Sequence, residues 1–378
     1  MKKNKGLGLY IHIPFCARKC NYCDFLSFPC GERQMEDYLD ALDREFFLWQ
    51  ETLEQRPLET IFIGGGTPSL LSVLQAEKLM QIIHRHCNLK DLKEFSIECN
   101  PNSLTREKIQ VYREFLVNRI SLGMQSSVNE ELALLGRLHT REEFEKAYDL
   151  VRQETDCQVN VDLMAAIPAQ TIASYKESLS YVTDLEPDHI SAYSLIVEEG
   201  TPFYEKYGIE PPVDEDTDRT MYELTKSFLR DKGYERYEIS NYAKKGRECQ
   251  HNLKYWRRQD YLGLGLGAAS CLGDKRFSNV RDLGAYEDLV GQGKRPIDQE
   301  EILSLQDQMS EFMYLGMRCV KGVSTKDFAR DFNRDLEEVY GDVLWNYEKM
   351  DLLKKEGDYW SLTEAGIDVS NQIFADFI

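Results

Sequence analysis

Three cysteines near the start of the chain constrain this sequence more than any other feature. Cys16, Cys20 and Cys23 are separated by three and then two residues, and they follow an alternating, strand-like run that ends at Pro14. Thiolates packed this closely are typical ligands of iron–sulfur clusters or of zinc. A structural zinc site normally has four protein ligands, whereas an aspartate and a phenylalanine follow Cys23. The spacing therefore favours a cluster of four irons in which one iron is open to a small molecule.

Two other interpretations of the cysteines remain open at this level. They could hold a structural zinc whose fourth ligand is distant in the sequence, and His12 is a candidate for that ligand. They could also be unrelated buried cysteines. His12 has apolar neighbours in a strand-like run, so it could equally be a core histidine with satisfied hydrogen bonds.

The composition indicates a two-part protein of a reducing compartment. With 378 residues the chain is long for one simple domain, and its 42% hydrophobic residues suffice for a sizeable core. The 46 Lys and Arg are outnumbered by 65 Asp and Glu, and the resulting net charge of −19 argues against a nucleic-acid partner. The ten cysteines are spaced irregularly, unlike a disulfide framework.

Nothing in the sequence predicts a membrane span or a secretion signal. No run approaches about 18 apolar residues, and the basic N-terminus, residues 1–5, is not followed by the apolar stretch of a signal peptide. We therefore expect a cytoplasmic protein. A membrane-bound partner would bring it to the membrane surface, although no strongly basic amphipathic helix is evident.

Short apolar runs and helical patterns alternate over the first half of the chain. Six runs with the composition of strands are each followed by a loop and then by apolar residues at helical spacing. This alternation predicts an α/β fold with a parallel sheet, and six units make a partial (β/α)6 relative of the eight-fold barrel. In such folds the chemistry lies at the carboxyl ends of the strands. The expected strands cover residues 8–13, 60–63, 94–98, 119–125, 158–164 and 189–196.

The pattern changes after the sixth strand. A loop-rich stretch contains the motif His-Asn-Leu-Lys-Tyr-Trp at 251–256, and the turn-like segment 291–296 could be a linker. Helical patterns and a short β-wing beyond it predict a small, winged-helix-like domain. We expect three parts: a core over residues 1–235, a loop-rich extension over 236–297 and a mostly helical C-terminal domain over 298–378.

Several loops at the expected carboxyl ends of strands carry residues suited to binding. Three glycines at 64–66 would let a ligand approach the backbone and leave amides free to bind it, or they form only a tight turn. No Gly-Lys-Ser/Thr follows, so this is not a P-loop. Glu98 and Asp162 could bind a ribose diol or an amine, or serve as helix caps. Gln125 and Arg137 would face the same mouth, although a surface ion pair is the simpler interpretation of Arg137 alone.

Together these motifs make the chain resemble the radical S-adenosylmethionine (SAM) superfamily. Within it, the chain is similar to the subfamily of oxygen-independent coproporphyrinogen III oxidases and their haem-chaperone relatives. The cysteine motif is specific for the superfamily, and the ordered set of later motifs is specific for the subfamily. The resemblance runs nearly end to end, through residues 10–16 with Cys20 and Cys23, 64–69, 97–101, 119–126, 135–139, 161–162 and 251–256.

The resemblance implies a [4Fe–4S] cluster on Cys16, Cys20 and Cys23, with SAM bound to the open iron through its amino and carboxylate groups. One electron from a low-potential donor would cleave SAM to methionine and a 5′-deoxyadenosyl radical, which the barrel has to shield from water. By motif match, Tyr10, Gly65, Gly66 and Thr67 border the methionine end, and Glu98, Gln125, Arg137 and Asp162 hold the carboxylate and the ribose.

Two departures separate this chain from the oxidases and favour the haem-chaperone branch. Phe25 occupies the position of the oxidases' fourth cysteine, and only nine residues precede Tyr10, so their N-terminal extension is missing. The resemblance then implies haem as a ligand. His251, Tyr255 and Trp256 are its candidate contacts, although without the family they would be assigned to the core.

We therefore expect a haem chaperone that delivers haem to acceptor haemoproteins such as respiratory enzymes. We expect it to be a monomer or a dimer and assign it no catalytic residue. The alternative is an enzyme that decarboxylates the propionates of coproporphyrinogen III by radical SAM chemistry, which Phe25 argues against.

Overall fold

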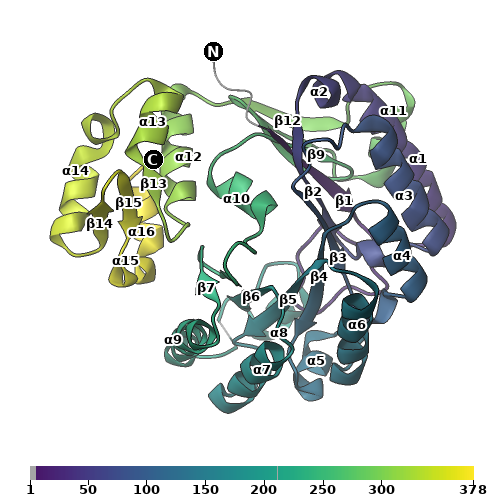
Figure 1. Ribbon diagram of the computed structural model, residues 1–378, viewed down its shortest axis with the longest axis horizontal. Coiled ribbons are helices and arrows are strands. Elements are labelled where there is room, and N and C mark those ends of the chain that lie inside the picture. Colours follow the sequence, from purple (N-terminus) through teal and green to yellow (C-terminus); the bar gives the residue numbers. More distant parts are fainter. Residues whose placement is uncertain (1–5, 211) are drawn as a thin grey trace.

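A sheet of twelve strands organises most of the chain (Figure 1). The computed structural model describes residues 6–210 and 212–378, so the basic N-terminus used in the signal-peptide prediction lies outside the described residues. The strands follow one another in the order β12-β11-β10-β9-β1-β2-β3-β4-β5-β6-β8-β7. A separate, three-stranded sheet lies in a C-terminal unit.

The centre of the large sheet confirms the predicted α/β alternation. Its strands β1 to β6 are parallel, lie side by side in chain order, and are connected through helices. The sheet is open, because further strands extend it on both sides and its end strands β12 and β7 do not pair with each other. The six central strands are β1 Leu7–Ile13, β2 Leu58–Gly65, β3 Glu94–Cys99, β4 Arg119–Gln125, β5 Gln158–Ala165 and β6 His189–Ser194.

The helices between these strands cover the outer face of the curved sheet (Figure 1). Three of them begin at a capping box, in which the side chains of Ser72, Thr140 and Thr171 accept a hydrogen bond from the amide three residues further on. Apolar residues at helical spacing turn inward, so that the sheet and its helices share one core. The helices are α1 Glu32–Leu48, α2 Gln50–Gln55, α3 Val73–His86, α4 Arg106–Glu114, α5 Asn129–Leu135, α6 Arg141–Glu154 and α7 Ile172–Asp184.

The segment expected to be a loop-rich extension is instead largely regular and extends the same sheet. Its strands escaped sequence analysis because they are short and because glycines, which are typical of loops, lie in β9 and directly after it. Gly263 illustrates this, since a Cβ at this position would lie 2.2 Å from the carbonyl oxygen of Ala269 on the neighbouring strand. The elements after β6 are α8 Pro202–Tyr207, α9 Glu215–Asp231, β7 Glu235–Arg236, β8 Asn241–Ala243, α10 Gln250–Trp256, β9 Tyr261–Leu264, β10 Ala269–Leu272, β11 Lys275–Asn279, α11 Leu283–Gly291 and β12 Ile297–Ile302.

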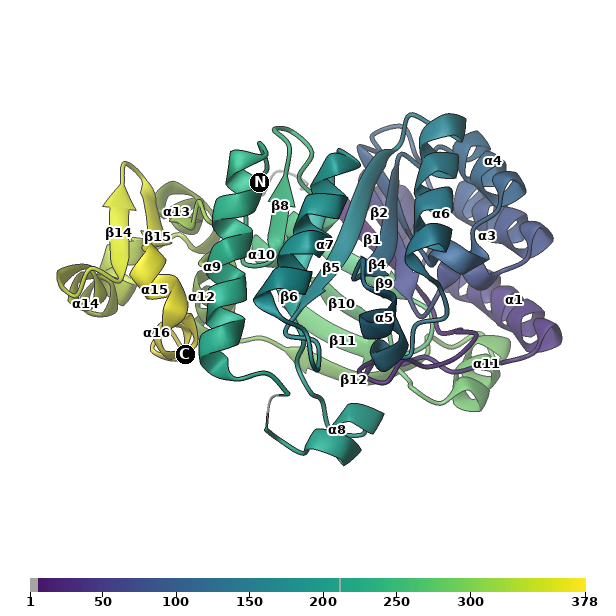
Figure 2. The same cartoon turned by 90° about the horizontal axis from the view of Figure 1, so that it is seen from below.

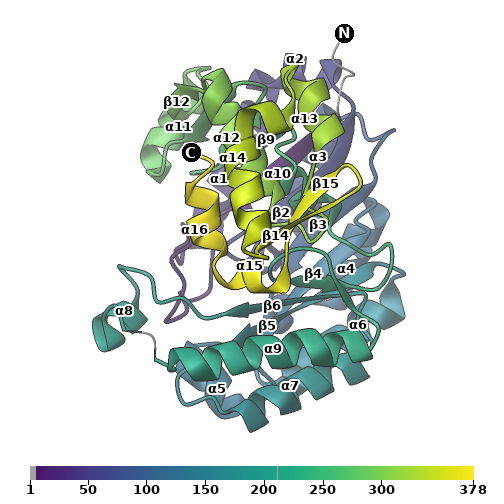
Figure 3. The ribbon, with the colours of Figure 1, turned by 90° about the vertical axis from the view of Figure 1, so that its left-hand side faces the viewer.

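The C-terminal unit lies at one end of the molecule, beyond α9 (Figure 2), and has its own hydrophobic core. Its helices surround the hairpin β14–β15, as a winged-helix-like unit would (Figure 3). Because β12 still pairs with β11, we propose that this domain begins near residue 303 rather than at 298. It contains α12 Leu305–Gly316, β13 Val323–Ser324, α13 Thr325–Phe332, α14 Leu336–Lys349, β14 Leu353–Glu356, β15 Tyr359–Leu362, α15 Glu364–Asp368 and α16 Ser370–Ala375.

All ten cysteines are free thiols. Within the described residues, no helix is both long and apolar enough to cross a bilayer.

Candidate functional site

The predicted site residues converge at the carboxyl ends of the central strands. A cavity of about 590 Å³ opens there, and we call it the site cavity. It is lined by the cysteine loop that follows β1 and by the ends of β2 to β6. The sequence predicts eleven residues as ligands of the cluster or of SAM. Ten of these residues line the site cavity: Cys16, Cys20, Cys23, Gly65, Gly66, Thr67, Glu98, Gln125, Arg137 and Asp162.

The cysteine loop is held in place by backbone hydrogen bonds at its two ends. The amide of Cys16 donates to the carbonyl of Phe28 over 3.1 Å, and the amide of Phe28 donates to Pro14 over 2.9 Å. In the middle of the loop, the amide of Asn21 donates to the carbonyl of Leu135 at the end of α5. The three thiols are half-buried and face one cavity, so the donor set fits a cluster with one open coordination position.

The geometry does not support a zinc ion shared with His12. Both ring nitrogens of His12 are engaged, Nδ1 with the Tyr10 hydroxyl at 2.9 Å and Nε2 with the carbonyl of Leu26 at 2.8 Å. Across residues 6–210 and 212–378, no three His, Cys, Asp or Glu side chains converge closely enough to hold a single metal ion. Cysteines of a cubane cluster each bind a different iron, so their sulfurs need not converge on one point.

The glycine loop after β2 shapes the floor of the site cavity. Gly65 has a φ of +110°, and a Cβ there would lie 2.4 Å from the ring of His12. A Cβ on Gly66 would lie 2.6 Å from the carbonyl oxygen of Phe15. Glycine at both positions therefore allows the backbone after β2 to lie close to β1 and to the cysteine loop.

The expectation that this loop offers free amides is wrong. The amide of Gly65 donates to Glu98 Oε2 over 3.1 Å, that of Gly66 donates to the carbonyl of Ile13, and that of Thr67 donates to the carbonyl of Phe15. The Gly66 amide bonds the last residue of β1 and the Thr67 amide bonds the start of the cysteine loop, so what the glycines provide is close approach.

Two half-buried carboxylates, those of Glu98 and Asp162, line the site cavity. Burial, reinforced by the charge of Asp162, raises the pKa of Glu98 to about 8. Burial also raises the pKa of Asp162, whose side chain accepts hydrogen bonds from Asn160 Nδ2 at 2.7 Å and Ser121 Oγ at 3.3 Å. A cationic ligand between these groups would favour their charged forms, and the sulfonium and amino groups of SAM are cations.

Arg137 faces the cavity and forms no ion pair with the residues that the structure describes. Its Nη2 donates to the carbonyl of Gly123 over 2.8 Å, and its Nη1 lies 3.9 Å from the sulfur of Cys20. The Nε atom is buried and has no acceptor among the described residues. A guanidinium with an unpaired donor next to the cluster loop fits a carboxylate ligand.

Gln125 and Tyr193 complete this wall of the cavity. Gln125 has a φ of +70°, a left-handed conformation that is uncommon for residues other than glycine and is often found at functional sites. Its side-chain oxygen accepts a hydrogen bond from the Tyr193 hydroxyl over 3.0 Å. Sequence analysis missed Tyr193, although its place at the end of the sixth predicted strand was a usable signal.

Tyr10 is the one proposed SAM residue that the structure does not bring to the cavity lining. It lies on β1, where its hydroxyl bonds to His12 and its ring lies 6.4 Å from that of Phe62. Its proposed role at the methionine end therefore has no support from this geometry.

His251, Tyr255 and Trp256 lie on α10, outside the site cavity, and His251 does not have the free nitrogen that haem ligation needs. The imidazole is fully buried, Nδ1 bonds Thr60 Oγ1 at 2.8 Å and Nε2 bonds the Tyr255 hydroxyl at 2.8 Å. Burial lowers the pKa of His251 to about 3, so the ring is neutral. The prediction that His251 ligates haem is therefore wrong. The side chain instead packs α10 against β2.

Comparison with known proteins defines the class to which this site belongs. The profile of the radical SAM superfamily matches residues 10–182, and that of the HemN C-terminal domain matches residues 303–369. The solved structure of coproporphyrinogen III oxidase (HemN) from Escherichia coli superposes with a TM-score of 0.86 at 22% sequence identity. The match covers 99% of this chain and 90% of that one. The fold is that of a radical SAM protein.

Relatives of similar length narrow this class to one family. The heme chaperone HemW of Bacillus subtilis (strain 168) is 36% identical over 374 residues, which cover 98% of each chain. The heme chaperone HemW of Escherichia coli (strain K12) is 34% identical and covers 100% of both chains. That of Lactococcus lactis subsp. lactis (strain IL1403) is 34% identical and covers 99% of this chain and 98% of its own. The chain belongs to the HemW family.

Proposed function

We propose that the protein is a haem chaperone that binds a [4Fe–4S] cluster, SAM and haem and passes the haem to acceptor haemoproteins. The observation that carries the proposal is the site cavity, which is lined by three half-buried thiols, a guanidinium with an unpaired nitrogen and two half-buried carboxylates. Further support comes from full-length relatives that are heme chaperones by name.

In this proposal Cys16, Cys20 and Cys23 hold the cluster, which supplies one-electron reduction when SAM is bound to it. Arg137 orients the carboxylate of SAM by charge, and its contact with Gly123 fixes the guanidinium. Glu98 and Asp162 accept hydrogen bonds from the amine or the ribose hydroxyls. Ser121 and Asn160 orient Asp162 for this task.

The cavity walls also keep water from the reacting end of SAM. Two backbone hydrogen bonds join the glycine loop to the end of β1 and to the start of the cysteine loop, which closes the floor. Phe25 is exposed at the rim, where the oxidases of the subfamily have a further cysteine. We therefore place oxidase activity second.

Two measurements on the cluster-reconstituted chain test the proposal. Titration with haem under anaerobic conditions is expected to reach a saturating, stoichiometric complex. Incubation with SAM, a reductant and coproporphyrinogen III is expected to give no protoporphyrinogen by chromatography. A chain that takes up no haem would overturn the chaperone proposal. A chain that forms protoporphyrinogen together with 5′-deoxyadenosine would replace it by the oxidase.

A further inference from the structure

A second cavity, of about 600 Å³, lies between α10 and the C-terminal unit, and we call it the inter-unit cleft. Helix α10 lies between that unit and the strands (Figure 1) and borders both cavities. Its residue Asn252 lines the site cavity, whereas Leu253 and Trp256 line the cleft. One short helix therefore separates the two spaces. The volume is within the range of about 300–1,000 Å³ that is usual for ligand pockets.

The cleft has an excess of positive charge, although the whole chain has a net charge of −19. Its lining contains five Lys and Arg but only three carboxylates, and those carboxylates, Glu59, Asp327 and Asp331, pair with three of the cations. The two other cations, Arg257 at the C-cap of α10 and Lys321 in the C-terminal unit, are exposed. Neither forms an ion pair with any residue in 6–210 or 212–378.

Aromatic side chains lie beside these two cations. The Lys321 ammonium is 4.2 Å from the centre of the Tyr359 ring, and Trp256 lies one residue before Arg257. Trp256 is backed by the guanidinium of Arg318, 5.5 Å from its ring centre. The cleft thus combines aromatic surface with two unpaired cations from two structural units, which suits a planar ligand with more than one carboxylate.

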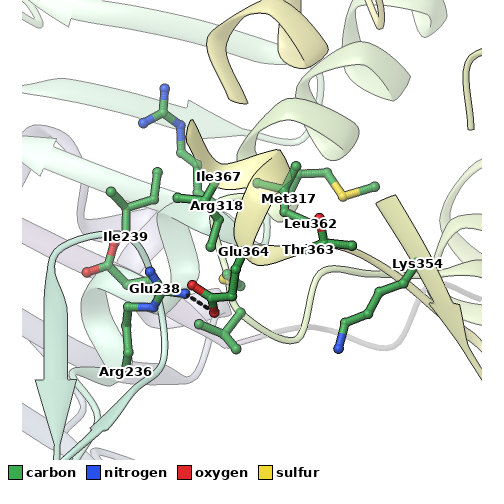
Figure 4. Close-up of a pocket in the computed structure, with 12 residues that line it drawn as sticks. Arg236, Glu238, Ile239, Met317, Arg318, Lys354, Leu362, Thr363, Glu364 and Ile367 are labelled. Carbon is green, nitrogen blue, oxygen red and sulfur yellow. Dashed lines mark hydrogen bonds and ion pairs between the residues drawn. The ribbon is translucent and has the colours of Figure 1, made fainter. Parts of the chain in front are cut away.

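Another part of the same junction is built differently. A smaller cavity of about 190 Å³ shares Cys319 with the cleft (Figure 4). There Arg236 pairs with Glu364 at 3.1 Å, and Lys354 pairs with Glu356 at 2.7 Å. Only the first pair joins the two units, because Lys354 and Glu356 both lie on β14. Arg318, the third cation of this cavity, is half-buried against the Trp256 ring, so among the described residues the exposed cations without an ion pair line the cleft and not this cavity.

We propose that the inter-unit cleft binds the haem, with Arg257 and Lys321 pairing with its two propionates and Trp256 and Tyr359 contacting the macrocycle. This inference rests on the proposed function and adds the location of the cargo. Because one cation belongs to α10 and the other to the C-terminal unit, the haem would bridge the two units. A change in the distance between the two units would then release the haem.

Haem and its dimethyl ester test this assignment, because the ester keeps the macrocycle and loses both carboxylates. Each is titrated by absorbance into the full chain and into the double variant Arg257→Gln/Lys321→Gln. We expect the double variant to bind haem about tenfold more weakly than the parent, and the ester to bind both proteins equally weakly. A matched control, Lys146→Gln/Lys275→Gln, removes the same charge from exposed positions outside the cleft and should bind haem like the parent.

Other outcomes overturn the assignment and separate it from the proposed function. If the parent binds haem but the double variant binds it equally well, or the ester binds as tightly as haem, the cleft is not the haem site. Lys19 lines the site cavity, so weaker haem binding by Lys19→Gln would indicate that the haem binds in that cavity instead. A parent chain that binds no haem at all would overturn the proposed function together with this inference.

Discussion

The site cavity and the inter-unit cleft are of nearly equal size but are built in opposite ways. In the site cavity the charged groups Glu98, Arg137 and Asp162 are half-buried and fixed by hydrogen bonds, as Asp162 is by Asn160 and Ser121. In the cleft the two decisive cations are exposed and belong to different structural units. The first arrangement suits a ligand whose reacting atoms must be oriented, and the second suits a cargo that has to leave.

Substitution of a cluster ligand should affect the site cavity most strongly while leaving the cleft unaffected. Cys20→Ser removes one of three thiolates, so the reconstituted variant should lose nearly all of the roughly four irons per chain expected of the cluster. Haem affinity should stay within about twofold of the parent, because Cys20 does not line the cleft. Iron analysis and haem titration measure the two effects.

Cys30→Ser is the control for this experiment, since Cys30 is a half-buried cysteine shortly after the triad that does not line the site cavity. It should keep the iron content of the parent. A Cys20→Ser protein with a full complement of iron would refute the assignment of the triad.

A smaller but still large effect is expected for Arg137→Ala. Removing a charged, partly buried hydrogen-bond donor should weaken SAM binding by about 10- to 100-fold, measured by anaerobic calorimetry on the reconstituted protein. The control Arg141→Ala removes a guanidinium that pairs at 3.4 Å with Glu177 at the surface, and should change the affinity less than twofold. If Arg137→Ala bound SAM as tightly as the parent, the guanidinium would act only through its hydrogen bond to the backbone of β4.

A substitution in the glycine loop should lower the stability of the chain. Gly65→Ala places a Cβ against His12 at a positive φ, which costs about 1–3 kcal/mol and lowers the Tm of the cofactor-free chain by roughly 2–8 °C. Gly31→Ala meets no atom within 4 Å and should leave the Tm nearly unchanged. Equal melting temperatures for the two variants would show that the loop relaxes more easily than its contacts indicate.

The smallest expected effect is a change in pH dependence. Because the folded pKa of Glu98 is about 8 and its ordinary value is 4.5, the folded state holds a proton that the unfolded state has lost between these values. The contribution of Glu98 to stability is therefore complete below about pH 4.5 and declines as the pH rises towards 8. Glu98→Gln should remove this decline, so its Tm relative to the parent should increase from pH 6 to pH 8.5, by a few degrees at most.

Thermal unfolding of the cofactor-free proteins at the two pH values measures this change. A constant Tm difference between Glu98→Gln and the parent would contradict it. Adding SAM to the reconstituted parent should reduce the pH effect, since a cationic ligand favours the ionised carboxylate.

The sequence predicted the central fold and most of the candidate site because both depend on local patterns. Apolar runs alternate with helical patterns, and in a parallel sheet the residues after each strand meet at one edge, which brought Glu98 and Asp162 together as expected. The predicted strand 119–125 agrees with β4 to the residue.

The remaining features depend on partners that are distant along the chain. His251 is occupied by Thr60, 191 residues away, and nothing in the local sequence 251–256 indicates that bond. The amides of Gly66 and Thr67 donate to the carbonyls of Ile13 and Phe15, about fifty residues earlier in the chain. Likewise Arg257 and Lys321 meet only because two structural units pack together, so the cleft could not be inferred from motifs.

The position of β1 between β2 and β9 has a consequence for biosynthesis. Gly8 to Ile11 on β1 pair with residues 261–264 on β9, so the first strand made is completed by a segment more than 250 residues later. At translation rates of about 5–20 residues per second, one edge of that strand waits roughly 13–50 s for its partner. The strand leads directly into the cysteine loop, so the thiols leave the ribosome well before their support is complete, and their protection from oxidation during this interval falls to the reducing surroundings of the nascent chain.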